Sequence, residues 1–116
     1  MRKQFVDTVS KIVQEDEKAV LLLGDIGVYG FKDLLNNYPL RAYNIGILEQ
    51  TTISVAAGMS LQGLIPIVHT IAPFIVERAL EQIKVDLCYQ SLGSNLVSVE
   101  SSYDYAELGC THHCPG

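Results

Sequence analysis

A run of apolar residues with no polar interruption, AVLLLGD at residues 19–25, constrains the fold of this chain more than any other segment. It follows the charged stretch QEDEK and ends at a glycine and an aspartate. A strand with one buried face alternates apolar and polar residues, whereas a strand inside a parallel sheet is apolar on both faces. The run therefore predicts a parallel strand that helices cover on both sides.

Helical and extended patterns alternate along the rest of the chain. The predicted helices cover residues 5–13, 31–38, 49–61 and a segment from Pro73 onward, and the predicted strands cover residues 19–25, 41–46, 64–71 and 95–101. This order predicts an α/β fold with a mainly parallel sheet, whose ligand sites lie beyond the carboxyl ends of the strands. The last residues, 102–116, are predicted to be loop. Because no further helix or strand follows, we expect residues 1–116 to be one domain that is incomplete at its C-terminal end.

The segment that begins at Pro73 is predicted to be the longest helix. Proline is a favoured first helical residue, and apolar side chains then recur every three or four positions. The predicted apolar face consists of Val76, Leu80, Ile83 and Leu87.

Charge and composition limit the classes of partner. The net charge is −5 and no basic block offsets it, which argues against a nucleic-acid surface. The first residues lack the apolar core of a leader peptide, and no apolar run is long enough to span a bilayer. With three cysteines, an odd number, a secreted disulfide framework is not expected. These features predict a cytoplasmic protein without a membrane partner.

The glycines at positions 24, 27 and 30 follow a strand and precede a helix, as in dinucleotide-binding proteins. Their spacing is G-x-x-G-x-x-G and not G-x-G-x-x-G, and the next strand ends at Asn44 where an acid for the ribose is expected. Asp25 with Asn36 and Asn37 could be considered as a magnesium site, but the two asparagines are more simply the last turn of a short helix. We therefore favour neither site.

Four potential zinc ligands lie within the sequence CTHHC at residues 110–114. Structural zinc sites usually draw their ligands from two separated pairs, and no second pair exists upstream. We expect no metal here. His112 is then either a polar group of a substrate cleft or an exposed loop histidine. His69 lies inside a predicted strand, and we assign it no functional role.

Glu49 stands where an apolar strand and turn lead into a helix that is almost entirely apolar or small. An acid in the first turn of a helix can simply favour the helix dipole. The flanking residues are so apolar, however, that the carboxylate is expected to be partly desolvated and able to hold or share a proton. A carboxylate in such surroundings needs a partner.

Three blocks of the sequence resemble, in order, the pyrimidine-binding domain of the transketolase family, which includes deoxyxylulose-phosphate synthase and the β subunits of pyruvate dehydrogenase-type enzymes. The blocks are YNIGILEQTTISVAAGMSLQGLIPIV, APFIVERALEQIKVDLCYQ and GCTHH. The resemblance implies that thiamine diphosphate lies between two subunits. The diphosphate and its Mg²⁺ are then held by the other domain and the aminopyrimidine by this one.

The resemblance also implies roles for individual residues. Glu49 occupies the glutamate position of the G-I-x-E-[QH] turn, which hydrogen-bonds a pyrimidine ring nitrogen and is catalytic because it shares a proton with the ring. Phe74 corresponds to the aromatic that stacks on the pyrimidine, and Ile71 stands where a second aromatic often contributes to the cofactor site. His112, in G-x-T-H, corresponds to a histidine that contacts the substrate.

Three positions besides Ile71 depart from the family pattern. Transketolases proper carry a histidine where this chain has Glu100 and an aspartate where it has Leu108, and Cys110 replaces the usual proline of G-P-T-H. A ketose-phosphate donor like that of transketolase is therefore not expected.

The resemblance implies the pyrimidine-binding half of a transketolase-type enzyme that transfers a two-carbon ketol or acyl unit. It implies a diphosphate-binding partner subunit, a homodimer or heterotetramer, and a small sugar or keto-acid substrate. Two alternatives remain open: a catalytically silent regulatory or assembly subunit of the same fold, and a nucleotide-binding, flavodoxin-like domain.

Overall fold

The computed structural model of the chain describes residues 1–100, 103 and 106–114. Its centre is a sheet of four parallel strands in the order β2-β1-β3-β4. The strands are β1 (Ala19–Leu23), β2 (Ala42–Asn44), β3 (Ile65–Ile71) and β4 (Asn95–Val99). Every residue of β1 is buried, as its apolar sequence predicts for a strand inside a parallel sheet.

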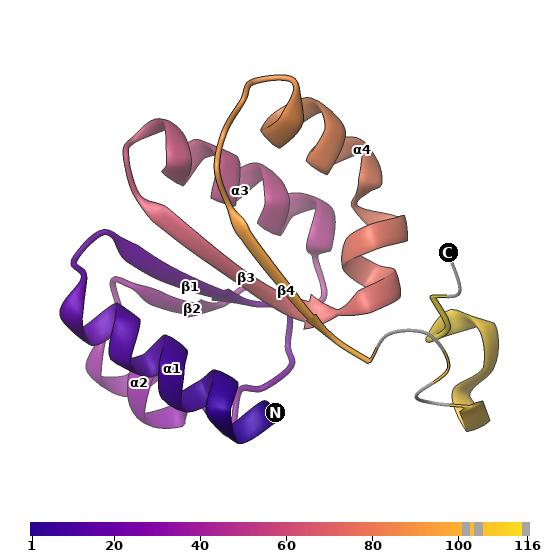
Figure 1. Cartoon of the computed structure of the whole chain (residues 1–116), viewed down its shortest axis with the longest axis horizontal. Coiled ribbons are helices and arrows are strands. Elements are labelled where there is room, and N and C mark those ends of the chain that lie inside the picture. The colour runs from indigo at the N-terminus through magenta and orange to yellow at the C-terminus, as the bar shows by residue number, and fades with distance from the viewer. Residues whose placement is uncertain (101–102, 104–105, 115–116) are drawn as a thin grey trace.

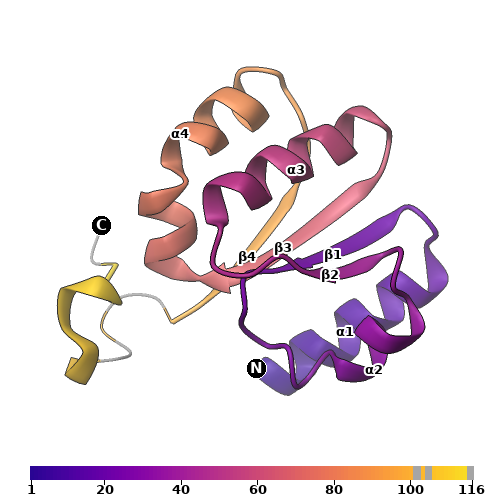
Figure 2. The same cartoon turned by 180° about the vertical axis from the view of Figure 1, so that it is seen from behind.

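Helices cover both faces of the sheet (Figures 1 and 2). One face carries α1 (Arg2–Glu15) and α2 (Lys32–Asn37), and the other carries α3 (Glu49–Leu61) and the helical segment that contains α4 (Leu80–Gln82). Successive residues of β1 point to opposite faces, so Leu21 and Leu23 pack in the α1 core while Val20 and Leu22 pack in the α3 core. The predicted α/β fold is confirmed.

The strand order positions the candidate site. After β1 the chain passes to β2 on one side, and it then crosses to β3 on the other side of β1. The connection that leaves β1 runs toward β2, whereas the one that leaves β3 runs toward β4 in the opposite direction. Ligands bind in open α/β sheets at the carboxyl edge where two such connections diverge. The starts of α3 and of the segment after β3 both lie at this edge (Figure 1).

The helical segment after Pro73 differs from its prediction. It consists of a π-helix η1 (Phe74–Arg78), the short α4, and a second π-helix η2 (Ile83–Cys88), so that α1 is the longest regular helix in the described part of the chain. The predicted apolar face is wrong at Val76 and Leu80, which are 47% and 58% exposed. The i→i+5 bonds of a π-helix insert extra residues into a turn and rotate the face, and the buried positions are Ile75, Ala79 and Leu87.

The last described segment also contains more structure than predicted. Residues 106–111 form 3₁₀-helical turns, η3 (Ala106–Thr111), with a non-helical break at Gly109, where a loop was expected, and they lie beyond the end of β4 (Figures 1 and 2). β4 ends at Val99, before the end of the predicted strand, and position 101 of that prediction lies outside the described residues. Among the described residues, no helix has the length and apolar character needed to cross a membrane.

Candidate functional site

Side-chain hydrogen bonds of Asn44 connect two loops and fix the turn that precedes Glu49. The side-chain oxygen of Asn44 accepts hydrogen bonds from the backbone N–H of Asp25 at 3.0 Å and of Gly46 at 3.3 Å, and its amide donates to Asp25 Oδ1 at 3.0 Å. Gly46 has a φ of +89°, a conformation that favours glycine. The loop after β1 and the turn after β2 are thereby held together where α3 begins.

Glu49, the first residue of α3, is only 2% exposed. Thr70 donates its hydroxyl to Glu49 Oε1 at 3.0 Å, and Arg78 Nη1 donates to Oε2 at 2.7 Å. The predicted desolvation is therefore confirmed, and the required partner is an arginine. A buried carboxylate is tolerated when its charge is paired and its oxygens are hydrogen-bonded, and both conditions hold here.

The end of β1 approaches this carboxylate so closely that only glycine fits at position 24. A Cβ atom there would lie 2.7 Å from Thr70 Oγ1 and 2.8 Å from Thr70 Cβ. The same Cβ would lie 3.5 Å from Glu49 Oε1. Gly24, the first glycine of the apparent dinucleotide pattern, thus has a packing role beside the Thr70–Glu49 hydrogen bond.

Arg78 connects Glu49 to two of the other predicted site residues. Its guanidinium carbon lies 4.1 Å from the centroid of the Phe74 ring, and the ring centroids of Phe74 and His112 are 5.1 Å apart. Glu49, Arg78, Phe74 and His112 therefore form a continuous series of contacts at the carboxyl edge of the sheet. Glu49 and Phe74, which the resemblance assigns to the same cofactor, thus lie near each other.

Sequence reasoning missed Arg78 and Thr70. A signal for Arg78 was present, because it follows Phe74 by four positions in one helical segment and such residues lie on the same side. Thr70 lies two positions after Val68, which packs on the α3 side. Because residues two positions apart in a strand share a face, the strand pattern also predicts that Thr70 points to that side.

The other residues named from the sequence have different surroundings. Ile71 ends β3, and alternation along that strand gives it the direction of His69, away from the α3 side. Its proposed contact with a cofactor stays a prediction. Of the positions that depart from the family pattern, Glu100 is buried and accepts a bond from Arg2 at 2.5 Å, while Leu108 and Cys110 are exposed.

The two adjacent histidines of CTHHC have different aromatic neighbours. His112 contacts Phe74, whereas His113 lies with its ring centroid 5.1 Å from that of Tyr103. Within residues 1–100, 103 and 106–114, no three His, Cys, Asp or Glu side chains are arranged to hold a metal ion. The structure thus associates His112, and not His113, with the site at Glu49.

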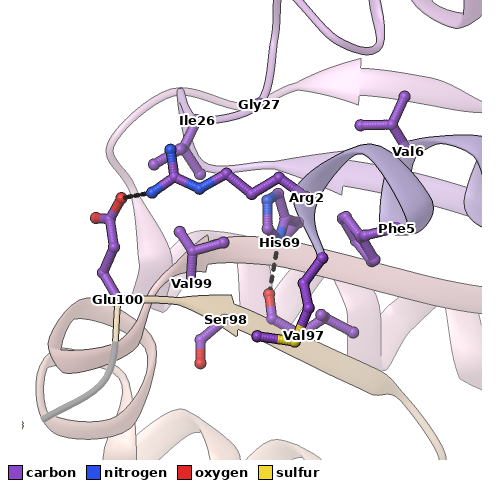
Figure 3. A pocket seen from close by; sticks show the side chains of 11 residues that line it. Arg2, Phe5, Val6, Ile26, Gly27, His69, Val97, Ser98, Val99 and Glu100 are labelled. Atoms are coloured by element: carbon purple, nitrogen blue, oxygen red, sulfur yellow. Dashed lines mark hydrogen bonds and ion pairs between the residues drawn. The ribbon is translucent and has the colours of Figure 1, made fainter. Parts of the chain in front are cut away.

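His69 lies on the opposite face of the sheet from Glu49, beside a cavity of about 450 Å³ (Figure 3). It is 3% exposed and packs against Phe5 of α1 with ring centroids 4.5 Å apart. Its Nδ1 lies 2.8 Å from the Val97 carbonyl oxygen, which can only accept, so Nδ1 carries the proton and donates. Burial lowers the pKa of His69 below 6.5, and the positive charge of Arg2 lowers it further. The hydrogen bond to Val97 and the negative charge of Glu100 raise the pKa but do not outweigh burial.

This pKa shift predicts a loss of stability at acidic pH. Because the pKa of His69 in the folded chain lies below the 6.5 of the unfolded chain, the unfolded chain binds more protons as the pH falls below that value. We expect the free energy of unfolding to decrease there, and His69→Phe to reduce this decrease. Urea unfolding at neutral and mildly acidic pH measures this decrease in the free energy of unfolding. An equal decrease in the wild type and the variant would contradict the assignment to His69.

Comparisons with known proteins identify the family of the chain. Residues 1–115 match the family described as transketolase, pyrimidine-binding domain. An uncharacterized 33.6 kDa protein in the fasciation locus of Rhodococcoides fascians is 44% identical over 112 residues, which is 97% of this chain and 36% of that protein. A subunit of the apulose-4-phosphate transketolase of Phocaeicola vulgatus is 34% identical over 113 residues, again 97% of this chain and 36% of the relative.

A solved structure gives the same result at the level of the fold. The structure described as a split-gene transketolase, inactive beta4 tetramer, is 32% identical and superimposes with a TM-score of 0.77 over 88% of this chain and 34% of its own. The chain therefore spans about a third of the length of these proteins.

Proposed function

The chain belongs to the transketolase pyrimidine-binding domain family, and we propose that it is the pyrimidine-binding half of a thiamine diphosphate-dependent enzyme of the transketolase type. The proposed reaction is the transfer of a two-carbon ketol or acyl unit. The observation that carries the proposal is the buried carboxylate of Glu49 next to the aromatic ring of Phe74, connected through Arg78. The family match leaves the alternative of a nucleotide-binding, flavodoxin-like domain without support.

The residues at the site fit an aminopyrimidine ring. Such a ring is flat, has polar nitrogens at its edge, and needs both a hydrogen-bonding carboxyl and an apolar face. Glu49 would hold the proton shared with a ring nitrogen, Thr70 would orient its carboxyl group through Oε1, and Phe74 would stack on the ring. When bound, thiamine diphosphate supplies the nucleophilic carbon that takes up the two-carbon unit.

The diphosphate and its Mg²⁺ are assigned to a partner subunit. Relatives of this chain are each named as one of the subunits of a transketolase, a name that implies a second subunit. The net charge of −5 also disfavours a diphosphate on this chain. We propose a homodimer or heterotetramer in which the cofactor lies between the two kinds of domain.

The substrate is proposed to be a small sugar or keto acid that contacts His112. The imidazole of His112 is half-buried beside Phe74, where it can hydrogen-bond a substrate held near the cofactor. Glu100 stands where transketolases proper have a histidine, and its carboxylate is paired with Arg2. This difference favours a donor other than the ketose phosphates that transketolase uses.

Reconstitution with a diphosphate-binding subunit tests the proposed function. The pair should convert at least one donor from a panel of ketose phosphates and 2-keto acids. His112→Gln should raise KM by about tenfold, as expected for one lost hydrogen bond worth about 1–2 kcal/mol, and leave cofactor affinity unchanged. His113→Gln, which changes the neighbouring histidine, is the matched control. An assembled pair that converts no donor would support the silent-subunit alternative.

A further inference from the structure

We propose that Arg78 occupies, in the cofactor-free chain, the space between Glu49 and Phe74 that the pyrimidine ring takes, so that cofactor binding displaces its guanidinium group. This inference rests on the proposed function. It adds a side chain that competes with the cofactor for the site.

The geometry of Arg78 carries the proposal. Its Nη1 is 2.7 Å from Glu49 Oε2 at the same time as its guanidinium carbon is 4.1 Å from the Phe74 ring centroid. The guanidinium therefore contacts the carboxylate and one face of the aromatic ring at the same time. A pyrimidine ring that hydrogen-bonds Glu49 and stacks on Phe74 must lie between the same two groups. Both cannot occupy that space.

The guanidinium group is also a chemical substitute for an aminopyrimidine. It is planar, its edge carries N–H donors that match a carboxylate, and its face stacks on aromatic rings. Its two contacts here fall on the same carboxyl group and the same aromatic ring that the pyrimidine is proposed to contact. On exchange, Glu49 loses the charged donor of Arg78 and takes up one proton from solvent, which Oε2 shares with the ring nitrogen while Thr70 stays on Oε1.

Exposure allows this exchange without disturbing the core. The side chain of Glu49 is 2% exposed, whereas that of Arg78 is 37% exposed. Arg78 reaches the carboxylate from the surface, and a change of its rotamer moves the guanidinium into solvent. The backbone of η1 and the buried neighbours Ile75 and Ala79 can stay in place.

The consequence is a reduced apparent affinity for the cofactor. Binding is weakened by the fraction of molecules in which Arg78 has left the site. If the inward state holds about nine-tenths of the population, Arg78→Gln should strengthen binding about tenfold. The glutamine keeps an N–H donor for Oε2 but neither the charge nor the full reach of the guanidinium.

The test uses the chain and a methyl-substituted aminopyrimidine, the neutral ring fragment of the cofactor, as the probe. A neutral probe removes the attraction between the guanidinium and the diphosphate. NMR titration follows the side-chain N–H signals of Arg78 and the ring signals of Phe74. We expect the Arg78 signals to lose their protection from solvent exchange as the Phe74 signals saturate. Lys84→Gln removes the same charge from the exposed side of the same helical segment, and it should leave the affinity unchanged.

The outcomes separate the two proposals. Arg78 signals that stay protected at saturation would overturn the displacement. Probe binding by Arg78→Gln that is equal to or weaker than wild-type binding would also overturn it. In both cases, probe contact with Phe74 would leave the proposed function intact. Absence of probe contact with Phe74 in the wild type and in both variants, at probe concentrations of about tens of millimolar, would overturn the proposed function itself. Should Arg78→Gln fail to fold, the titration of the wild-type chain decides alone.

Discussion

Replacing Glu49 with alanine should abolish turnover of the reconstituted enzyme and leave subunit assembly intact. The carboxyl group is the proposed proton-sharing partner of the pyrimidine, and loss of such a group lowers rates by about two to four orders of magnitude. Glu49 is 2% exposed at the start of α3, so its removal does not alter an exposed surface. Steady-state kinetics measures the loss of turnover, and size-exclusion chromatography measures assembly.

Two further variants separate the catalytic role from a structural one. Glu77→Ala removes an exposed acid from η1, close to the site in sequence, and should leave turnover unchanged.

In Glu49→Ala, Arg78 loses its buried partner, so this variant should also have a lower melting temperature than the wild type. Glu49→Gln keeps a side chain of similar size, and should fold with little change in melting temperature and still fail to turn over. Undiminished activity in Glu49→Ala would mean that the carboxylate is misassigned.

Local sequence pattern predicted most of the fold. The uninterrupted apolar run at residues 19–25 indicated a doubly covered strand, and β1 is buried at every position. The alternation of strand and helix then indicated a parallel sheet with both faces covered. These features follow from hydrophobic periodicity, which acts over a few residues.

The helical segment after Pro73 was predicted with the wrong face because periodicity assumes one geometry throughout. A repeat of three or four residues corresponds to an α-helix, whereas η1 and η2 have i→i+5 bonds. Val76 and Leu80 consequently lie outside the core, and Ile75 and Ala79 lie in it. No propensity in the sequence marks a π-turn, whose position depends on packing against α3 and β3.

The sequence indicated residues of the candidate site but not the contacts between them. Motif resemblance indicated four residues, Glu49, Phe74, Ile71 and His112. The fold connects Glu49, Phe74 and His112 at one edge of the sheet, whereas Ile71 is directed to the opposite face. The ion pair from Glu49 to Arg78 joins residues 29 positions apart, and sequence reasoning predicted only that the carboxylate needed a partner. The partner's identity depends on how α3 and η1 pack, which no local pattern contains.

A second large effect is expected from the partner subunit. Alone, this chain offers the cofactor a hydrogen bond to Glu49 and stacking on Phe74, worth about 2–4 kcal/mol together. A millimolar complex needs about 4 kcal/mol, and the loss of translational and rotational freedom opposes association. The net charge of −5 and the ion pair of Arg78 with Glu49 lower the affinity further. Weak binding and no turnover are therefore expected without the partner.

Calorimetry with thiamine diphosphate and Mg²⁺ tests the central claim, which is that this chain holds the pyrimidine and a partner holds the diphosphate. The account predicts weak binding, about millimolar or weaker, to the chain alone. It also predicts tight, magnesium-dependent binding once the diphosphate-binding subunit is added. Micromolar, magnesium-dependent binding to the chain without a partner would contradict the account and place the diphosphate site on this chain.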